Sequence, residues 1–265
     1  MKVVILAGGY GTRFGKLTDF IPKPMIPVGS MPIVWHIMRY YAAFGHNEFI
    51  LATGYKAEMI KEFFSNLNLL SSDFTVDYGG SGQMEFHSRL DEFRPKVTVA
   101  YTGQDTMTGG RVKRIEKYLG SDDSFFLTYG DGLSNIDLDA LLKFHRNHGK
   151  LGTLTAVYPP PRFGDLKFDG DRIVEFSEKQ GTKGAMVNGG FYVFQRQALE
   201  YLSEDRSCIL EKKPLEQMAL HGQLMGFRHE GYWQCMDTTR DLESLQQSWI
   251  DGKAPWKVWK DGQAD

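Results

Sequence analysis

The segment Val3-Val4-Ile5-Leu6-Ala7-Gly8-Gly9-Tyr10-Gly11-Thr12-Arg13-Phe14, close to the N-terminus, decides the fold class. Its first five residues are all apolar, which is typical of a strand covered on both faces of a parallel sheet. Three glycines follow, and glycine lets a backbone approach a ligand closely with its N–H groups pointing at an anion. The segment therefore predicts a buried strand followed by a ligand-binding loop that ends in Arg13.

Two familiar glycine loops are excluded by the residues that follow. A P-loop requires Gly-Lys-Ser or Gly-Lys-Thr at a fixed spacing, and neither is present. A dinucleotide fingerprint starting at Gly9 would require glycine or alanine where Phe14 stands. Downstream, Pro22-Lys23-Pro24-Met25 places one lysine between two prolines, which fix the backbone around it. This favours an ammonium held for a phosphate, and a rigid surface turn with a solvated lysine is the alternative.

Similar apolar runs recur along the chain and alternate with segments of helical length. The expected strands are 3–7, 49–53, 97–102, 125–129, 154–158 and 191–194, and the expected helices are 32–44, 57–67, 111–119, 138–148 and 239–249. This alternation predicts an α/β fold of the Rossmann-like type, with a mixed, mainly parallel sheet flanked by helices. We expect one domain, 1–265, in which 151–250 extends the sheet of 1–150 and 251–265 forms a tail.

Composition excludes several classes of protein. The chain has 265 residues, 31 lysines plus arginines and 33 aspartates plus glutamates, so its net charge of −2 argues against nucleic-acid binding. Its two cysteines exclude a disulfide framework and a thiolate zinc site. No apolar run is long enough to span a membrane, and the first strand enters its glycine turn too early for a signal peptide. We expect a cytoplasmic protein with no membrane contact.

The glycine loop and the Pro-Lys-Pro turn, taken together, resemble the signature of the sugar-1-phosphate nucleotidylyltransferases, also called nucleotide-sugar pyrophosphorylases. The resemblance covers nearly the whole chain. Its further motifs are Tyr129-Gly130-Asp131-Gly132, Phe176-Ser177-Glu178-Lys179, Asn188-Gly189-Gly190-Phe191 and Met236-Asp237-Thr238. One departure is Gln180, where relatives usually have proline, which loosens the turn behind Lys179.

The resemblance implies a reaction and a set of site residues. A sugar-1-phosphate oxygen attacks the α-phosphorus of a nucleoside triphosphate and pyrophosphate leaves, with 1–150 binding the nucleotide and 151–250 the sugar phosphate. It assigns catalysis to Arg13 and Lys23, nucleotide binding to Leu6, Ala7, Gly8, Gly9, Gly11, Thr12, Thr106, Arg111 and Gly130, sugar-phosphate binding to Glu178, Lys179, Asn188 and Gly189, and Mg²⁺ binding to Asp131 and Asp237.

The chemistry of these residue types agrees with the implied reaction. Both reactants are anions, so the site needs cations and backbone donors rather than a covalent nucleophile. Arginine grips phosphate oxygens with a planar fork, and lysine acts as a point charge. Asp131 follows an expected strand, at the edge where open α/β sheets bind ligands, and Mg²⁺ needs few carboxylates. The alternative for Gly130-Asp131-Gly132 is a plain turn.

Substrate choice and assembly also follow from the resemblance. The motifs Trp35-His36-Ile37-Met38, Met107-Thr108-Gly109-Gly110-Arg111 and Lys253-Ala254-Pro255-Trp256-Lys257 are similar to those of family members that use CTP and glucose 1-phosphate. Arg111 could donate to O2 and N3 of cytosine, whereas N3 of uracil carries a proton. We expect a homo-oligomer, trimer or hexamer, because the tail has two tryptophans and the helix from Pro32 carries an aromatic stripe.

Two alternatives stay open from the residues alone. One is a pyrophosphorylase for another triphosphate (UTP, dTTP or GTP) or another hexose 1-phosphate. The other is a regulatory protein that binds a nucleotide without turnover. Joint retention of Arg13, Lys23, Asp131 and Asp237 argues against the second, because binding alone would not require all four.

Overall fold

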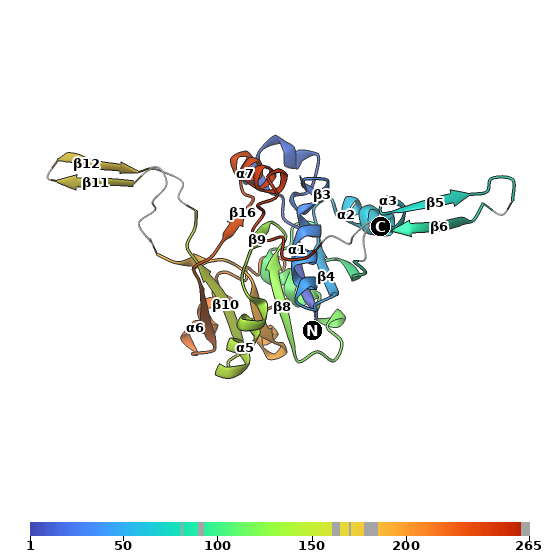
Figure 1. Ribbon diagram of the computed structural model, residues 1–265. Coiled ribbons are helices and arrows are strands. Elements are labelled where there is room, and N and C mark those ends of the chain that lie inside the picture. The colour runs from blue at the N-terminus through green and yellow to red at the C-terminus, as the bar shows by residue number, and fades with distance from the viewer. Residues whose placement is uncertain (81, 90–92, 161–164, 170, 178–184, 261–265) are drawn as a thin grey trace.

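The computed structural model describes residues 1–80, 82–89, 93–160, 165–169, 171–177 and 185–260 (Figure 1). Within them, a central sheet of eight strands has the order β13-β10-β14-β8-β1-β4-β7, with β15 paired to β10. Its strands are β1 (Val3–Ala7), β4 (Glu48–Thr53), β7 (Lys96–Tyr101), β8 (Ser124–Tyr129), β10 (Gly152–Val157), β13 (Val187–Asn188), β14 (Tyr192–Gln195) and β15 (Leu224–His229).

The direction of the strands confirms the predicted mixed, mainly parallel sheet. Strands β8, β1, β4 and β7 run parallel to one another, so their carboxyl ends share one edge. Strand β14 pairs antiparallel with both β8 and β10, whereas β15 runs parallel to β10. Strands from before and after residue 150 thus belong to a single sheet.

The helices are α1 (Ile33–Ala43), α2 (Ala57–Ser65), α3 (Leu67–Leu70), α4 (Thr108–Arg114), α5 (Leu138–His148), α6 (Lys213–Leu220) and α7 (Thr239–Ile250). The expected helix 111–119 is wrong at both ends, because α4 begins at Thr108 and a 3-10 turn, Glu116–Tyr118, follows it. Tertiary packing explains the early start. A Cβ on Gly109 would lie 2.7 Å from the Cys208 sulfur, and one on Gly110 would lie 2.6 Å from the Asp205 carbonyl oxygen, so α4 needs both glycines.

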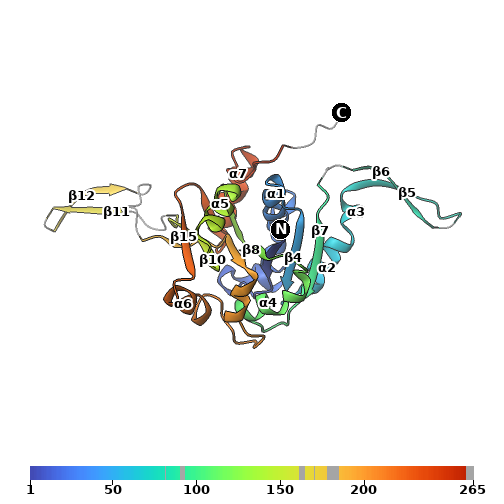
Figure 2. The same cartoon turned by 90° about the horizontal axis from the view of Figure 1, so that it is seen from below.

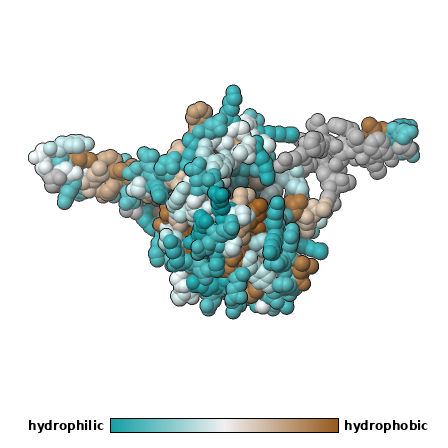
Figure 3. Space-filling view, turned by 180° about the vertical axis from the view of Figure 1, so that it is seen from behind, coloured by the Kyte–Doolittle hydropathy of each residue, from teal (hydrophilic) through white to brown (hydrophobic). Residues whose placement is uncertain are grey.

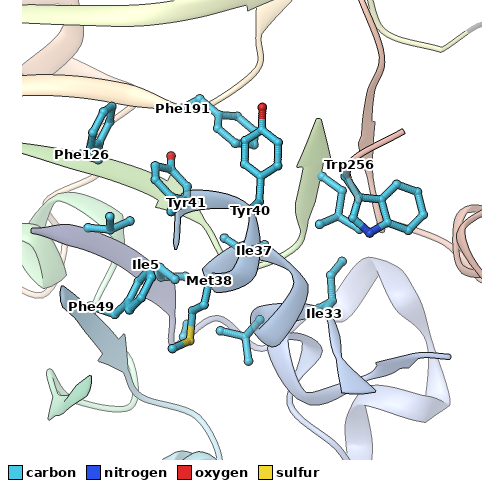
Figure 4. Packing of buried hydrophobic residues seen from close by; sticks show 14 of the residues in the cluster. Ile5, Ile33, Ile37, Met38, Tyr40, Tyr41, Phe49, Phe126, Phe191 and Trp256 are labelled. Atoms are coloured by element: carbon cyan, nitrogen blue, oxygen red, sulfur yellow. The ribbon is translucent and has the colours of Figure 1, made fainter. Parts of the chain in front are cut away.

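Alternation along β1 sends side chains to two separate cores. Val3 and Ile5 pack on the side of α1, α5 and α7, where one large cluster includes Tyr40, Tyr41, Phe126, Phe191 and Trp256 (Figures 2 and 4). Val4 and Leu6 face the opposite cluster, to which α4 and α6 contribute. The aromatic stripe on α1 is therefore core: Trp35, Met38 and Tyr41 are all buried.

Two hairpins extend from opposite sides of the molecule as arms (Figures 1 and 2). They are β5–β6 (Ser72–Val76 with Met84–Arg89) and β11–β12 (Asp165–Asp169 with Arg172–Ser177), and neither belongs to the central sheet. Smaller ribbons are β2–β3 (Pro27–Val28 with Met31–Pro32) and β9–β16 (Gly132–Ser134 with Trp233–Cys235). Short 3-10 segments are Thr12–Phe14, Lys16–Asp19, Lys23–Met25 and Arg196–Tyr201.

The C-terminal tail corrects an expectation about subunit contact. Trp256 is completely buried within its own chain, where its ring stacks on Tyr232 at 5.8 Å between centroids and its indole N–H faces His36 Nδ1 at 3.4 Å. The tryptophan that was expected to pack against a neighbouring subunit instead completes the core beside α1 (Figure 4). In the described part of the chain, no helix is both long and apolar enough to cross a bilayer.

Candidate active site

The parallel strands β8, β1, β4 and β7 end together, and chemistry-bearing loops follow each of them. The glycine loop follows β1, Gly130-Asp131 follows β8, Gly54 follows β4, and Thr102-Gly103 follows β7. Strand order reverses between β8 and β1, because the chain goes from β1 to β4 on one side and later adds β8 on the other. Ligands of open α/β sheets bind at such a switch point.

Arg111 joins three of these loops from inside the protein. Its guanidinium donates to five acceptors at 2.7–3.0 Å, and the side chain is almost completely buried. The acceptors are the carbonyl oxygens of Gly8, Thr53, Gly103 and Gln104 and the hydroxyl of Thr102. Burial lowers the pKa of Arg111 to about 10, which leaves it positively charged at neutral pH. The geometry makes Arg111 the structural centre of these loops, with its guanidinium occupied by their acceptors.

Two glycines of the loop, Gly8 and Gly11, stand where a side chain would clash or be strained. A Cβ on Gly8 would lie 2.3 Å from Arg111 Nη1, and one on Gly54, on the other side, would lie 2.2 Å from the same atom. Gly11 has φ of +67° and faces Thr18, so it accommodates both a left-handed turn and a close contact. Thr106, predicted near the nucleotide, is buried, and its hydroxyl accepts from Arg114 Nη1 at 2.9 Å.

Lys23 lies at the centre of the charged part of the site. Its ammonium donates to Asp131 Oδ2 and to Asp237 Oδ1, both at 2.6 Å. Burial alone would lower the pKa of Lys23, but the two carboxylates outweigh it and raise that pKa. Pro22, at φ −65°, precedes the 3-10 turn Lys23–Met25, so the predicted rigid turn positions an ammonium that is paired rather than solvated.

Asp131 and Asp237 are brought together by pairing between distant segments. Strand β16 pairs antiparallel with β9, and the Met236 N–H donates to the Asp131 carbonyl at 2.9 Å. Asp237 then precedes α7, whose capping box has Thr238 as N-cap and Asp241 at the third position. Asp241 Oδ2 also accepts from the Asp237 N–H at 3.0 Å, which fixes the backbone that carries the second carboxylate.

Arg13 stands at the open end of the same cluster. Its Nη1 lies 3.2 Å from Asp237 Oδ2, while four fifths of the side chain is exposed. Burial would raise the pKa of Asp237, but Lys23 and Arg13 hold it below its usual value. Burial and the same carboxylate raise the pKa of Cys235 to about 12, so its thiol is protonated and unreactive at neutral pH. Arg13 is thus the cation of the cluster with most freedom to move onto a ligand.

The donor set of Asp131 and Asp237 fits a magnesium ion. Both carboxylates already bind one cation, the Lys23 ammonium, so their oxygens converge on a single point. Among the described residues, no group of three or more His, Cys, Asp and Glu side chains could hold a metal. Mg²⁺ commonly takes one or two carboxylates and completes its shell with water and phosphate oxygens, so two aspartates are sufficient.

The predicted sugar loop lies beside the same, carboxyl end of β8, because Tyr192 of β14 pairs with Leu127 of β8. Asn188 ends β13, and Gly190 and Phe191 follow with φ of +77° and +47°. A positive φ is rare for phenylalanine, so the surrounding contacts must hold this turn. Trp233 Nε1 donates to the Gly189 carbonyl at 2.8 Å. Glu178 and Lys179, the other predicted sugar-phosphate residues, lie outside the described residues.

Sequence reasoning missed two parts of this site. Gly54 lies directly after an expected strand, and that position was the available signal for its close approach to Arg111. Glu211 accepts hydrogen bonds from Thr108 at the start of α4 and from Tyr129 at the end of β8, each at 2.6 Å. Nothing in the sequence around Glu211 indicates this role, because it depends on contacts with residues far away in the chain.

Comparison with known proteins gives one consistent family. The nucleotidyl transferase family model matches residues 2–251. The chain is 44% identical over 260 residues to the glucose-1-phosphate cytidylyltransferase of Salmonella typhi, covering 98% of this chain and all of the relative. It is 40% identical, with 98% of this chain and all of the relative covered, to a Bacillus subtilis protein named probable glucose-1-phosphate cytidylyltransferase.

A solved structure extends the likeness to the fold. The UDP-glucose pyrophosphorylase complexed with UDP-glucose superposes with a TM-score of 0.67, covering 95% of this chain and 98% of the other at 15% identity. At that identity the likeness concerns the fold alone. The family model covers almost the whole chain and the two curated relatives match it from end to end, so the chain belongs to the nucleotidyl transferase family.

Proposed function

We propose that this protein transfers the cytidylyl group of CTP to glucose 1-phosphate, which gives CDP-glucose and pyrophosphate. The observation that carries the choice of substrates is the 44% identity, over nearly the full chain, to a glucose-1-phosphate cytidylyltransferase. The clustered charges at the sheet edge support turnover rather than binding alone. Lys23, Arg13, Asp131 and Asp237 lie within one network of ion pairs beside the glycine loop.

The triphosphate would lie along the glycine loop at the carboxyl end of β1. Backbone groups of Leu6, Ala7, Gly8 and Gly9, and those of Gly11, Thr12 and Gly130, would line its path. Because the Arg111 guanidinium is occupied by carbonyl oxygens, we assign recognition of the base to backbone groups that Arg111 holds in place. Backbone groups that match N3 and N4 of cytosine would leave polar atoms unpaired with uracil.

The side chains of the cluster would act on the phosphates. Arg13, which is exposed, would swing from Asp237 onto the phosphates and stabilise charge that moves to the leaving pyrophosphate. Lys23 would neutralise the phosphate nearest to the two aspartates. Asp131 and Asp237 would hold Mg²⁺, which when bound draws charge from the phosphate oxygens. Glu178, Lys179, Asn188 and Gly189 would bind the sugar phosphate and align its oxygen for in-line attack.

Product analysis tests this proposal. Purified protein is incubated with CTP, glucose 1-phosphate and Mg²⁺, and the products are identified by ³¹P NMR and mass spectrometry. We expect CDP-glucose and pyrophosphate in equal amounts, and neither product without added Mg²⁺. Other hexose 1-phosphates in place of glucose 1-phosphate provide the specificity control. Absence of CDP-glucose under these conditions contradicts the proposal.

We also propose a homo-oligomer, built through the arms. A two-stranded hairpin is marginally stable alone in water, yet β5–β6 exposes Phe74, Met84 and Phe86 along its length (Figure 3). A second copy of the chain would cover these side chains. Light scattering at micromolar concentration should give a mass of three or six chains, and a monomer would contradict the proposal.

A further inference from the structure

A chain of hydrogen bonds runs beneath the proposed sugar site and ends on Glu211, which lies between the turn Arg196–Tyr201 and α6. Tyr129 Oη donates to Glu211 Oε1 at 2.6 Å, the Tyr129 and Tyr192 hydroxyls are 2.9 Å apart, and Asn188 Nδ2 lies 2.5 Å from the Tyr192 hydroxyl. The other carboxylate oxygen, Oε2, accepts from Thr108 in the first turn of α4 at 2.6 Å. Glu211 therefore links the nucleotide-side helix to the sugar loop.

The carboxylate sets the direction of every bond in this chain. An ionised carboxylate can only accept, so the Tyr129 proton points to Glu211. Tyr192 must then donate its own proton to the Tyr129 oxygen, because each phenol has one proton. The Tyr192 oxygen can consequently only accept from Asn188, which places the amide nitrogen of Asn188 against Tyr192. Burial, then Tyr192 and Glu211, raise the pKa of Tyr129, so its phenol keeps the proton.

An independent contact gives the same orientation of Asn188. Its Oδ1 accepts from the Gly190 N–H at 3.0 Å, so the oxygen cannot also occupy the side that faces Tyr192. The Tyr129 ring also supports the loop, since a Cβ on Gly190 would lie 2.9 Å from a ring carbon. Asn188 is exposed on its outer side. It therefore presents a donor and an acceptor in fixed places, as recognition of sugar hydroxyls requires.

We propose that Glu211 is a positioning residue for the sugar phosphate: it anchors a directed hydrogen-bond chain through Tyr129 and Tyr192 that fixes the amide of Asn188. The inference rests on the proposed function, because it assumes that Asn188 contacts the sugar. Without an acceptor at 211, Tyr129 is free to donate to Tyr192, and Tyr192 to Asn188. Asn188 Nδ2 would then face a Tyr192 hydroxyl that is no longer bound to accept, and the Gly190 N–H would be left to hold the amide in its orientation.

Two substitutions at position 211 separate this role from a general structural one. Glu211→Met has similar length but no strong acceptor, so the Michaelis constant for glucose 1-phosphate should rise about tenfold or more, as loss of one or two hydrogen bonds implies. In the same variant, the Michaelis constant for CTP should change by less than about threefold. Glu211→Gln can present its carbonyl to Tyr129 and its amide N–H to Thr108. Glu211→Gln should therefore have a Michaelis constant for glucose 1-phosphate within about threefold of the wild-type constant.

A third variant covers the case in which Glu211→Met does not fold. Tyr192→Phe removes one hydroxyl from the middle of the hydrogen-bond chain and keeps the ring. It should also raise the Michaelis constant for glucose 1-phosphate more than that for CTP. The proposal is overturned if the folded Glu211→Met or Tyr192→Phe protein keeps the wild-type constant for glucose 1-phosphate, or if Glu211→Gln is as impaired as Glu211→Met. Failure of the wild-type protein to use CTP and glucose 1-phosphate would instead contradict the proposed function.

Discussion

Replacement of Arg111 by alanine is expected to destabilise the loops that follow β1, β4 and β7. The substitution removes the donor that the carbonyl oxygens of Gly103 and Gln104 have now. The carbonyl of Gly8 keeps the Tyr55 N–H, and that of Thr53 keeps the N–H and hydroxyl of Thr102. A buried polar group that loses its partner costs about 1–3 kcal/mol, so two carbonyls at the low end give about 2 kcal/mol. A loss of this size is substantial, because a typical domain is stabilised by only about 5–15 kcal/mol.

Urea denaturation with and without saturating CTP measures this effect. We expect Arg111→Ala to lower the free energy of unfolding by about 2 kcal/mol and to weaken CTP and UTP binding alike, because the loops themselves lose their support. Arg111→Lys keeps a charge with three donors instead of five and should lose about half as much. A stable Arg111→Ala protein that loses only its preference for CTP over UTP would contradict the supporting role of Arg111. It would indicate instead that Arg111 contacts the base directly.

Four other substitutions test the charged cluster and the core. Arg13→Ala should lower kcat about 100-fold and change the Michaelis constant for CTP little, because its contact is strongest in the transition state; near-normal kcat in steady-state assays would contradict that role. Asp131→Asn and Asp237→Asn should each raise the Mg²⁺ concentration for half-maximal rate, and activity that persists in excess chelator would refute the two-aspartate site. Burial lowers the pKa of His36 from 6.5 to about 4, so protonation favours the unfolded chain and stability falls as pH drops through that window. Between pH 7 and 5, the wild-type protein should lose about 2 kcal/mol more of its free energy of unfolding than His36→Gln, as measured by urea titration. The same pH dependence in both proteins would contradict this.

Elements with strong local signals could be predicted from the sequence. Strand β1 has the predicted bounds because five consecutive apolar residues suit a strand buried on both faces. Helix α5, Leu138–His148, also has its predicted bounds, because Asp137 caps its first turn and Gly149, at φ +63°, ends it. These signals lie within the element itself, so they need no knowledge of the fold.

The site was predictable in its residue types and not in its contacts. Asp131 and Asp237 were expected to act together, but only the pairing of β9 with β16 explains how they meet. Arg111 was expected to face the base, whereas its environment consists of carbonyls from segments far apart in the chain. Glu211 carries no local pattern at all. Non-local pairing decides each of these cases, and a sequence does not display it.

The rate of pyrophosphate release from each of CTP, UTP, dTTP and GTP, with glucose 1-phosphate and Mg²⁺, identifies the nucleotide that the protein uses. We predict the highest kcat/KM for CTP, by about tenfold or more over UTP, because one mismatched polar contact at the base costs about 1–3 kcal/mol. Turnover of UTP or dTTP at least as efficient as that of CTP would contradict the assignment of the cytidylyl group.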